Sequence, residues 1–131
     1  MVKVVFRTRL LIGLFALLLP VVLLPHAYAQ IAGQGAISGT VTDPSGAVIP
    51  GAKITATANG TGVKTVKIST GTGYYVVSPL LPGTYTVEVS APGFQNFKQE
   101  KVTVDALQNV GLNPKLAIGS AADTVTVSTA P

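Results

Sequence analysis

The sequence that follows residue 29 predicts an all-β domain, a single two-sheet antiparallel sandwich with about seven strands. Stretches in which every second residue is apolar recur at roughly ten-residue spacing, as in such sandwiches. Turn residues, mainly Gly, Pro, Asn and Asp, separate these stretches. No apolar stripe with the period of a helix appears between them, so a fold in which strands alternate with helices is not favoured.

The first 29 residues have the pattern of an export signal. A basic start precedes an apolar run over residues 10–24, and a small-x-small site, AYA, follows at residues 27–29. We expect a signal-peptide helix over residues 1–29, cleaved between Ala29 and Gln30. The alternative is an uncleaved membrane anchor, but the run is shorter than the roughly 20 residues that a spanning helix needs, and Pro20 interrupts it.

Most of the positive charge belongs to this leader. The whole chain carries a net charge of +4, whereas the part from Gln30 has six lysines, no arginine and five acids, a net charge of +1. No basic stripe remains that would indicate a nucleic-acid partner. The chain has no cysteine, so disulfides and thiolate chemistry are excluded.

The residue types that most enzymes and metal sites need are also missing. The one histidine, His26, lies in the leader, so the rest of the chain has neither His nor Cys. Zinc sites with nitrogen and sulfur ligands, and Ser-His-Asp or Cys-His nucleophiles, are therefore excluded. The five acids are scattered, and no loop contains the several that calcium needs. We expect no catalytic residues, no metal and no cofactor.

The first half of the domain predicts three strands. In residues 35–42 the apolar Ile37 and Val41 share one face, and Asp-Pro-Ser-Gly at 43–46 has the order of a type I turn. Residues 52–58 alternate again. Asn59-Gly60 is a strong hairpin signal, since both residues tolerate a positive φ. The expected inward residues of the strand pair that this hairpin joins are Ile54, Ala56 and Ala58, then Val66 and Ile68.

The stretch from Gly73 to Phe94 predicts two strands joined by a Pro-Gly corner, and it is the clearest strand signal in the chain. Its second strand places Tyr85, Val87 and Val89 on one face and polar residues on the other. In the first strand, Tyr75 is expected inside and Tyr74 outside. Further strands follow over residues 94–104 and 107–116.

The tail, residues 117–131, differs from the rest. Its first residues are typical of a linker, and an eight-residue segment then alternates as a free strand would, with no turn and no partner after it. This segment comprises Asp123, Thr124, Val125, Thr126, Val127, Ser128, Thr129 and Ala130.

From residue 35 to 116 the chain resembles the carboxypeptidase regulatory-like domain. The residues that carry the resemblance are Gly39-Thr40-Val41, Asp43, Gly46, Ile49-Pro50-Gly51-Ala52, Gly73, Tyr75, Val77, Leu80, Pro82-Gly83-Thr84-Tyr85, Val87, Val89 and Gly93-Phe94. The resemblance implies a seven-stranded, transthyretin-like Greek-key sandwich without catalytic residues. One departure is the run Thr70-Gly71-Thr72, where the family usually has an acid or Asn.

The leader, this domain and the tail together resemble the N-terminus of a TonB-dependent outer-membrane receptor. The segment from Asp123 to Ala130 resembles the TonB box, which such receptors offer to the energy-transducing TonB protein as an added strand. The resemblance implies export to the periplasm and outer membrane, with TonB or a downstream plug and barrel as partner. The expected parts are 1–29 signal, 30–34 flexible start, 35–116 sandwich and 117–131 linker with strand.

Two alternatives stay open. The tail segment can be a last strand or linker of the same domain rather than a TonB box. The chain can also be a standalone secreted module, either a structural or adhesive one or a carbohydrate-binding sandwich.

Overall fold

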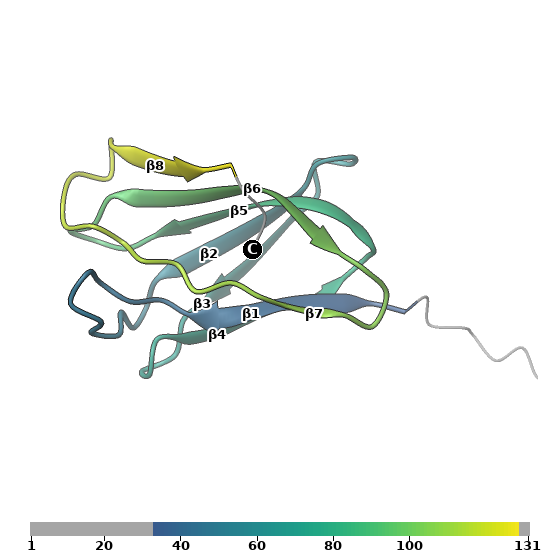
Figure 1. Ribbon diagram of the computed structural model, residues 1–131, viewed down its shortest axis with the longest axis horizontal. Coiled ribbons are helices and arrows are strands. Elements are labelled where there is room, and N and C mark those ends of the chain that lie inside the picture. The colour runs from purple at the N-terminus through teal and green to yellow at the C-terminus, as the bar shows by residue number, and fades with distance from the viewer. Residues whose placement is uncertain (1–32, 129–131) are drawn as a thin grey trace, which may run out of the picture. The chain divides into compact units, whose positions relative to one another are not determined.

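The computed structural model describes residues 33–128, which form two packed β-sheets (Figure 1). One sheet has three strands in the order β4-β1-β7, and the other has five in the order β3-β2-β5-β6-β8. The strands are β1 Gly35–Thr40, β2 Lys53–Ala58, β3 Lys64–Ile68, β4 Tyr74–Leu80, β5 Gly83–Ser90, β6 Asn96–Val104, β7 Asn109–Gly111 and β8 Thr124–Val127. The predicted all-β sandwich is confirmed. Residues 33–128 include no helix long and apolar enough to cross a membrane.

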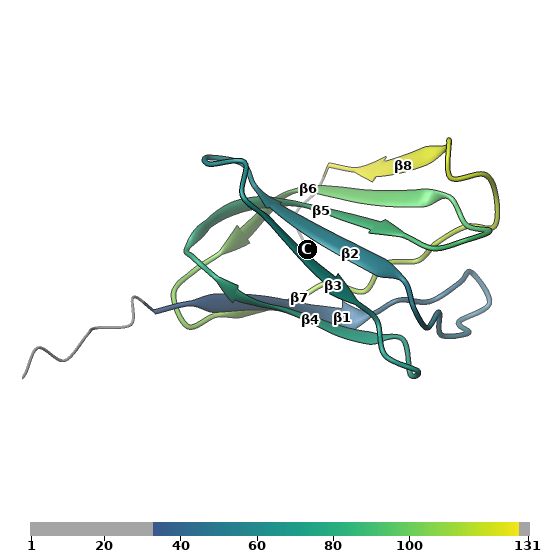
Figure 2. The same ribbon diagram turned by 180° about the vertical axis from the view of Figure 1, so that it is seen from behind.

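The sandwich differs from the expected one at two of its edges. It has eight strands rather than seven, and two of the pairings are parallel, β1 with β7 and β6 with β8. Parallel neighbours need a crossover between them. After β6 the chain crosses to the other sheet, runs beside β1 as β7, and returns to pair with β6 as β8 (Figures 1 and 2).

The core lies between the two sheets and is built from alternate residues of the strands. The three residues predicted to share one face of β5, Tyr85, Val87 and Val89, are all buried. The two neighbouring tyrosines of β4 divide as expected, with Tyr75 1 % exposed and Tyr74 44 % exposed. The other buried apolar residues are Ile37, Val41, Ile49, Ala52, Ile54, Ala56, Val77, Leu80, Ala91, Phe97, Val102, Val104, Leu112 and Leu116.

Two glycines of the family pattern lie where a side chain would collide with backbone. A Cβ atom at Gly39 would be 1.8 Å from the carbonyl oxygen of Leu112, in the segment that follows β7. At Gly73 a Cβ atom would be 2.8 Å from the carbonyl oxygen of Val41, and the residue has a φ of 72°. Each glycine therefore permits a close approach between chain segments that are distant in sequence.

The hairpin between β2 and β3 is confirmed, but its loop is longer than the Asn59-Gly60 signal indicates. The amide of Ala58 donates to the carbonyl of Val63 at 2.8 Å, which leaves four residues in the loop. The residue with a positive φ is Gly62, at 72°, and its amide donates to the carbonyl of Ala58 at 2.7 Å.

The prediction that Val66 and Ile68 face inward is wrong. Val66 is 47 % exposed and Ile68 is 57 % exposed. Val66 lies opposite Thr55, and Ile68 lies opposite Lys53, on the outer face of the five-stranded sheet. β3 is also the edge strand of that sheet, so among residues 33–128 Val66 and Ile68 have no neighbouring strand beyond the edge whose side chains could cover them.

The predicted turn at residues 43–46 is confirmed. The amide of Gly46 donates to the carbonyl of Asp43 at 3.0 Å. The Asp43 carboxylate accepts three further hydrogen bonds, from the Ser45 hydroxyl at 2.6 Å and from the amides of Ser45 and Ala47, each at 2.9 Å. These bonds, the Ser45 hydroxyl above all, lower the pKa of Asp43 because they favour its ionised form.

Candidate interaction surfaces

The tail strand is a strand of the same domain, paired on one side, rather than the free strand that its alternation predicts. β8 runs parallel to β6, with Thr124 opposite Asn96 and Val127 opposite Gln99. The segment before β8 is attached to the start of β6, since the Asn96 side chain donates to the carbonyl of Ala121 at 2.7 Å and the Asn96 amide donates to the carbonyl of Asp123 at 3.0 Å. The expected linker is therefore part of the domain up to this point.

The other side of β8 is the edge of the sheet, because β8 is last in the order β3-β2-β5-β6-β8. In a parallel ladder, the residues that bond to a given neighbour alternate along the strand. The bond from Asn96 to Asp123 therefore directs the amides of Val125 and Val127 toward β6 and those of Thr124 and Thr126 toward the free edge. β8 thus offers outward-facing donors and acceptors to a further strand.

Some of the predicted site residues lie outside the described part of the chain. These are Ala29 and Gln30 at the expected cleavage site, and Thr129 and Ala130 at the end of the tail segment. The remaining residues of the tail segment lie in β8 or directly next to it.

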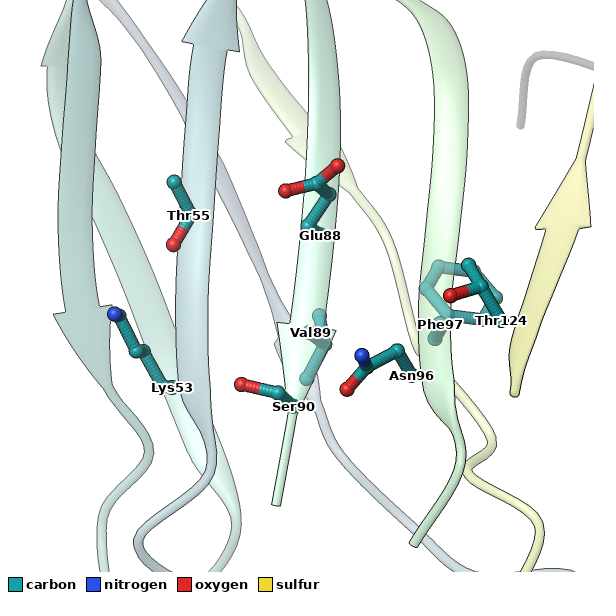
Figure 3. A pocket seen from close by; sticks show the side chains of 8 residues that line it. All are labelled: Lys53, Thr55, Glu88, Val89, Ser90, Asn96, Phe97 and Thr124. Carbon is teal, nitrogen blue, oxygen red and sulfur yellow. The ribbon is translucent and has the colours of Figure 1, made fainter. Parts of the chain in front are cut away.

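A hollow on the outer face of the five-stranded sheet was not predicted from the sequence. Its centre is a row of four residues that lie next to one another on four adjacent strands, Lys53 on β2, Ser90 on β5, Asn96 on β6 and Thr124 on β8 (Figure 3). The hollow has a volume of about 220 Å³, and Thr55, Glu88, Val89 and Phe97 also line it. Because the small Ser90 stands between the longer Lys53 and Asn96, the row is lowest at its middle. We call this hollow the row pocket.

The side chain of Asn96 has one polar atom without a hydrogen-bond partner in the described part of the chain. Its Oδ1 atom is buried and has no hydrogen-bond partner among the described residues. The Ala121 carbonyl can only accept, so the Asn96 atom that faces it must be the amide nitrogen, which leaves the oxygen as the unpaired atom. A buried acceptor without a partner costs about 1–3 kcal/mol. Buried polar atoms without a partner are rare in folded proteins, and a bound molecule that donates a hydrogen bond would account for this one.

The charges in and beside the row pocket are balanced. Beside the row pocket, the Lys98 ammonium and the Glu100 carboxylate form an ion pair at 2.9 Å. Their mutual hydrogen bond raises the pKa of Lys98 and lowers the pKa of Glu100, so both stay ionised at neutral pH. Within the pocket, Lys53 and Glu88 contribute one positive and one negative charge.

A second hollow is apolar and lies between the β2–β3 loop and the corner that joins β4 to β5. It has a volume of about 550 Å³, and its lining includes Val63, Leu81, Pro82 and Tyr85. Val63 is 62 % exposed and Leu81 is 60 % exposed. The corner itself is fixed by Tyr85, whose hydroxyl donates to the carbonyl of Leu81 at 2.7 Å.

Neither hollow has the groups of a catalytic or metal centre. Among residues 33–128, no three His, Cys, Asp or Glu side chains lie close enough together to bind a metal ion. The chemistry available on these surfaces is hydrogen bonding, strand addition and apolar contact.

Three solved structures show the same fold at low sequence identity. A suspected carbohydrate-binding protein from Bacteroides uniformis has a TM-score of 0.53 at 21% identity, over 63% of this chain and 41% of its own. The minor pilin of Streptococcus agalactiae has a TM-score of 0.53 at 12% identity, over 70% and 47%. A 3-chlorocatechol 1,2-dioxygenase from Rhodococcus opacus has a TM-score of 0.52 at 9% identity, over 72% and 64%. In each case less than two thirds of the solved chain is matched.

The sequence comparisons identify the domain itself. The search of curated proteins gives no match. The family model of the carboxypeptidase regulatory-like domain matches residues 36–117, which include β1 from its second residue, β2 to β7, and the core. This family is a non-catalytic module, in agreement with the hydrogen-bonding surfaces described above. The chain belongs to the carboxypeptidase regulatory-like domain family.

Proposed function

We propose that this chain is an exported, non-catalytic interaction module at the periplasmic face of the outer membrane, the N-terminal part or a truncated relative of a TonB-dependent receptor. The observation that carries the proposal is β8, a short alternating strand with an acidic residue before it and a free edge. Its sequence resembles the TonB box, and the leader has the pattern of an export signal.

The proposed mechanism is strand addition. A partner strand pairs with the edge of β8 through the outward-facing amides and carbonyls of Thr124 and Thr126, and extends the five-stranded sheet by one strand. Main-chain hydrogen bonds provide affinity in this mode, and the alternating side chains provide register. The chain needs no catalytic group for this function.

Binding to the periplasmic domain of TonB tests the proposal. The Thr126→Pro variant removes one outward-facing donor, and proline also opposes a central position in a sheet. We expect it to bind TonB at least tenfold more weakly than the wild type. A matched control is Gly71→Pro, which places proline in the exposed turn between β3 and β4, where a Cβ atom would meet no other atom within 4 Å. The control variant should bind like the wild type.

Equal binding of TonB by the wild type and by Thr126→Pro, in a protein whose unfolding curve is unchanged, would overturn the strand-addition mechanism. Weakening by both proline variants alike would contradict it too, because the effect would then not depend on β8.

Export is tested at the other end of the chain. N-terminal sequencing of the protein recovered from the periplasm or outer membrane should begin at Gln30, after removal of the leader. A protein that begins at Met1 would contradict cleavage and favour an anchor.

The second candidate is a standalone secreted module, structural, adhesive or carbohydrate-binding. The row pocket favours it, and the fold is shared with a pilin and with a suspected carbohydrate-binding protein. The reading frame after Pro131 separates the two candidates. A frame that continues into a plug and barrel supports the receptor, and a stop codon with no barrel-coding frame nearby supports the standalone module.

A further inference from the structure

The geometry points to the row pocket as a binding site for one small, uncharged polyhydroxyl molecule, such as a single sugar ring, whose binding stabilises β8 on the sheet. The pocket is a built feature rather than a gap between loops, because its four central residues occupy consecutive places across four paired strands. Figure 3 shows their side chains on one face of the sheet.

The groups that line the pocket match hydroxyl ligands. Lys53 provides donors, the Glu88 carboxylate provides acceptors, and the hydroxyls of Ser90 and Thr124 do both. The Oδ1 atom of Asn96 is unpaired but buried, so a ligand hydroxyl can donate to it only when the Asn96 side chain turns toward the pocket. A sugar hydroxyl both donates and accepts, so adjacent hydroxyls can bond to alternating donors and acceptors.

Charge and size restrict the ligand further. Lys53 and Glu88 are the two charged side chains in the lining, and they cancel, so the pocket favours neither an anion nor a cation. The volume of about 220 Å³ is below the range typical of drug-sized ligands, which indicates one ring rather than a chain of them.

The pocket is complete only when β8 is paired. Thr124 is the first residue of β8, and Asn96 is oriented by its bond to Ala121 just before that strand. A ligand that contacts Thr124 and Asn96 therefore binds the paired state of β8 better than an unpaired one. By linkage, the ligand must stabilise the pairing by the same factor by which the pairing strengthens ligand binding.

The first experiment is an NMR titration of the purified chain with D-glucose, D-mannose and N-acetylglucosamine, with glycine and acetate as charged comparators. We expect saturable shifts at Ser90, Asn96 and Thr124 with at least one sugar and none with the comparators. Lys53→Met should weaken binding about tenfold, the loss expected for one charged hydrogen bond. Its control is Lys64→Met, an exposed lysine on β3 outside the lining, which should bind like the wild type.

Ser90→Leu fills the middle of the row and should abolish binding, with an unfolding curve showing that the fold is kept. Saturation by none of the sugars, or by glycine or acetate instead, would overturn the assignment of the ligand class. Equal weakening by Lys53→Met and Lys64→Met would overturn the assignment of the pocket.

The second experiment tests the link to β8. Val125→Pro removes an amide that faces β6, whereas Thr126→Pro removes one that faces the free edge. We expect Val125→Pro to weaken sugar binding at least tenfold and Thr126→Pro to leave it unchanged. Saturating sugar should slow hydrogen exchange of the Val127 amide by the same factor by which pairing of β8 strengthens sugar binding, at least tenfold.

Sugar binding that is as tight in Val125→Pro as in the wild type would overturn the link. None of these measurements uses TonB, so failure of the pocket leaves the strand-addition proposal standing, and failure of TonB binding leaves the pocket standing.

Discussion

The hydroxyl of Tyr75 on β4 donates a hydrogen bond of 2.7 Å to the carbonyl of Leu112, in the segment that follows β7. The two residues lie on opposite sides of β1, which is the middle strand of the three-stranded sheet. Both residues are buried, so the bond is formed away from water. It links the segment that follows β7 to β4 across β1.

Tyr75→Phe should lower the free energy of unfolding by about 1–3 kcal/mol, because it leaves the Leu112 carbonyl buried without that donor. Urea unfolding measures this effect. Tyr74→Phe is the matched control, since its side chain is 44 % exposed, and it should change the stability by less than about 0.5 kcal/mol. Equal effects of the two variants would contradict a special role for the Tyr75 hydroxyl.

The same tyrosine should make the domain sensitive to alkaline pH. Burial raises the pKa of Tyr75, because the interior disfavours the phenolate. A raised pKa in the folded state gives stability that is complete below the unfolded-state pKa of about 10 and is lost as the pH rises above it. Between pH 9 and pH 11, the wild type should therefore lose more stability than Tyr75→Phe. Parallel pH profiles for the two proteins would show that Tyr75 does not titrate on unfolding.

Gly39→Ala should be among the most damaging single changes in the domain. Its Cβ atom would lie 1.8 Å from the Leu112 carbonyl oxygen, so β1 and the segment after β7 must separate. We expect a loss of about 3 kcal/mol or more in the free energy of unfolding. Gly60→Ala is the control, with no atom within 4 Å of the added Cβ and no positive φ, and it should stay within about 0.5 kcal/mol of the wild type.

The parts of the fold that sequence predicts well are those that depend on local alternation and turn chemistry. Alternation predicts that Tyr85, Val87 and Val89 share a buried face, and this is confirmed, because β5 lies in the interior of its sheet between β2 and β6. Asp43 and Gly46 form the predicted turn for reasons that involve only their own neighbours.

Val66 and Ile68 show where this reasoning fails. Alternation shows that the side chains of Val66 and Ile68 point to the same face of the sheet. It does not show whether that face packs against the other sheet or is exposed to water. An antiparallel hairpin with an even number of loop residues places Val66 opposite an odd-numbered residue of β2, here Thr55, and those residues face outward. The hairpin geometry therefore decides which face the two residues are on, and both side chains stay exposed on the edge strand β3.

The row pocket and the neighbour of β8 could not be predicted, because both depend on the order of strands in a sheet. Ser90 and Asn96 are close in sequence, but Lys53 and Thr124 are far from them and become their neighbours only once β2, β5, β6 and β8 lie in that order. The alternation of the tail segment indicates a strand, but nothing local indicates that it pairs in parallel with β6 after a crossover of nearly twenty residues, 105–123.

The central claim, that the edge of β8 takes up a partner strand, can be tested directly by cysteine crosslinking. The chain has no cysteine, so single Thr126→Cys and Thr72→Cys variants each carry one thiol, the second in the exposed turn between β3 and β4. A series of single cysteines along the partner-binding strand of TonB completes the pairs. The proposal predicts disulfides between Thr126→Cys and alternate positions of that strand, and none with Thr72→Cys. Crosslinks that form equally from both variants, or from neither, would contradict it.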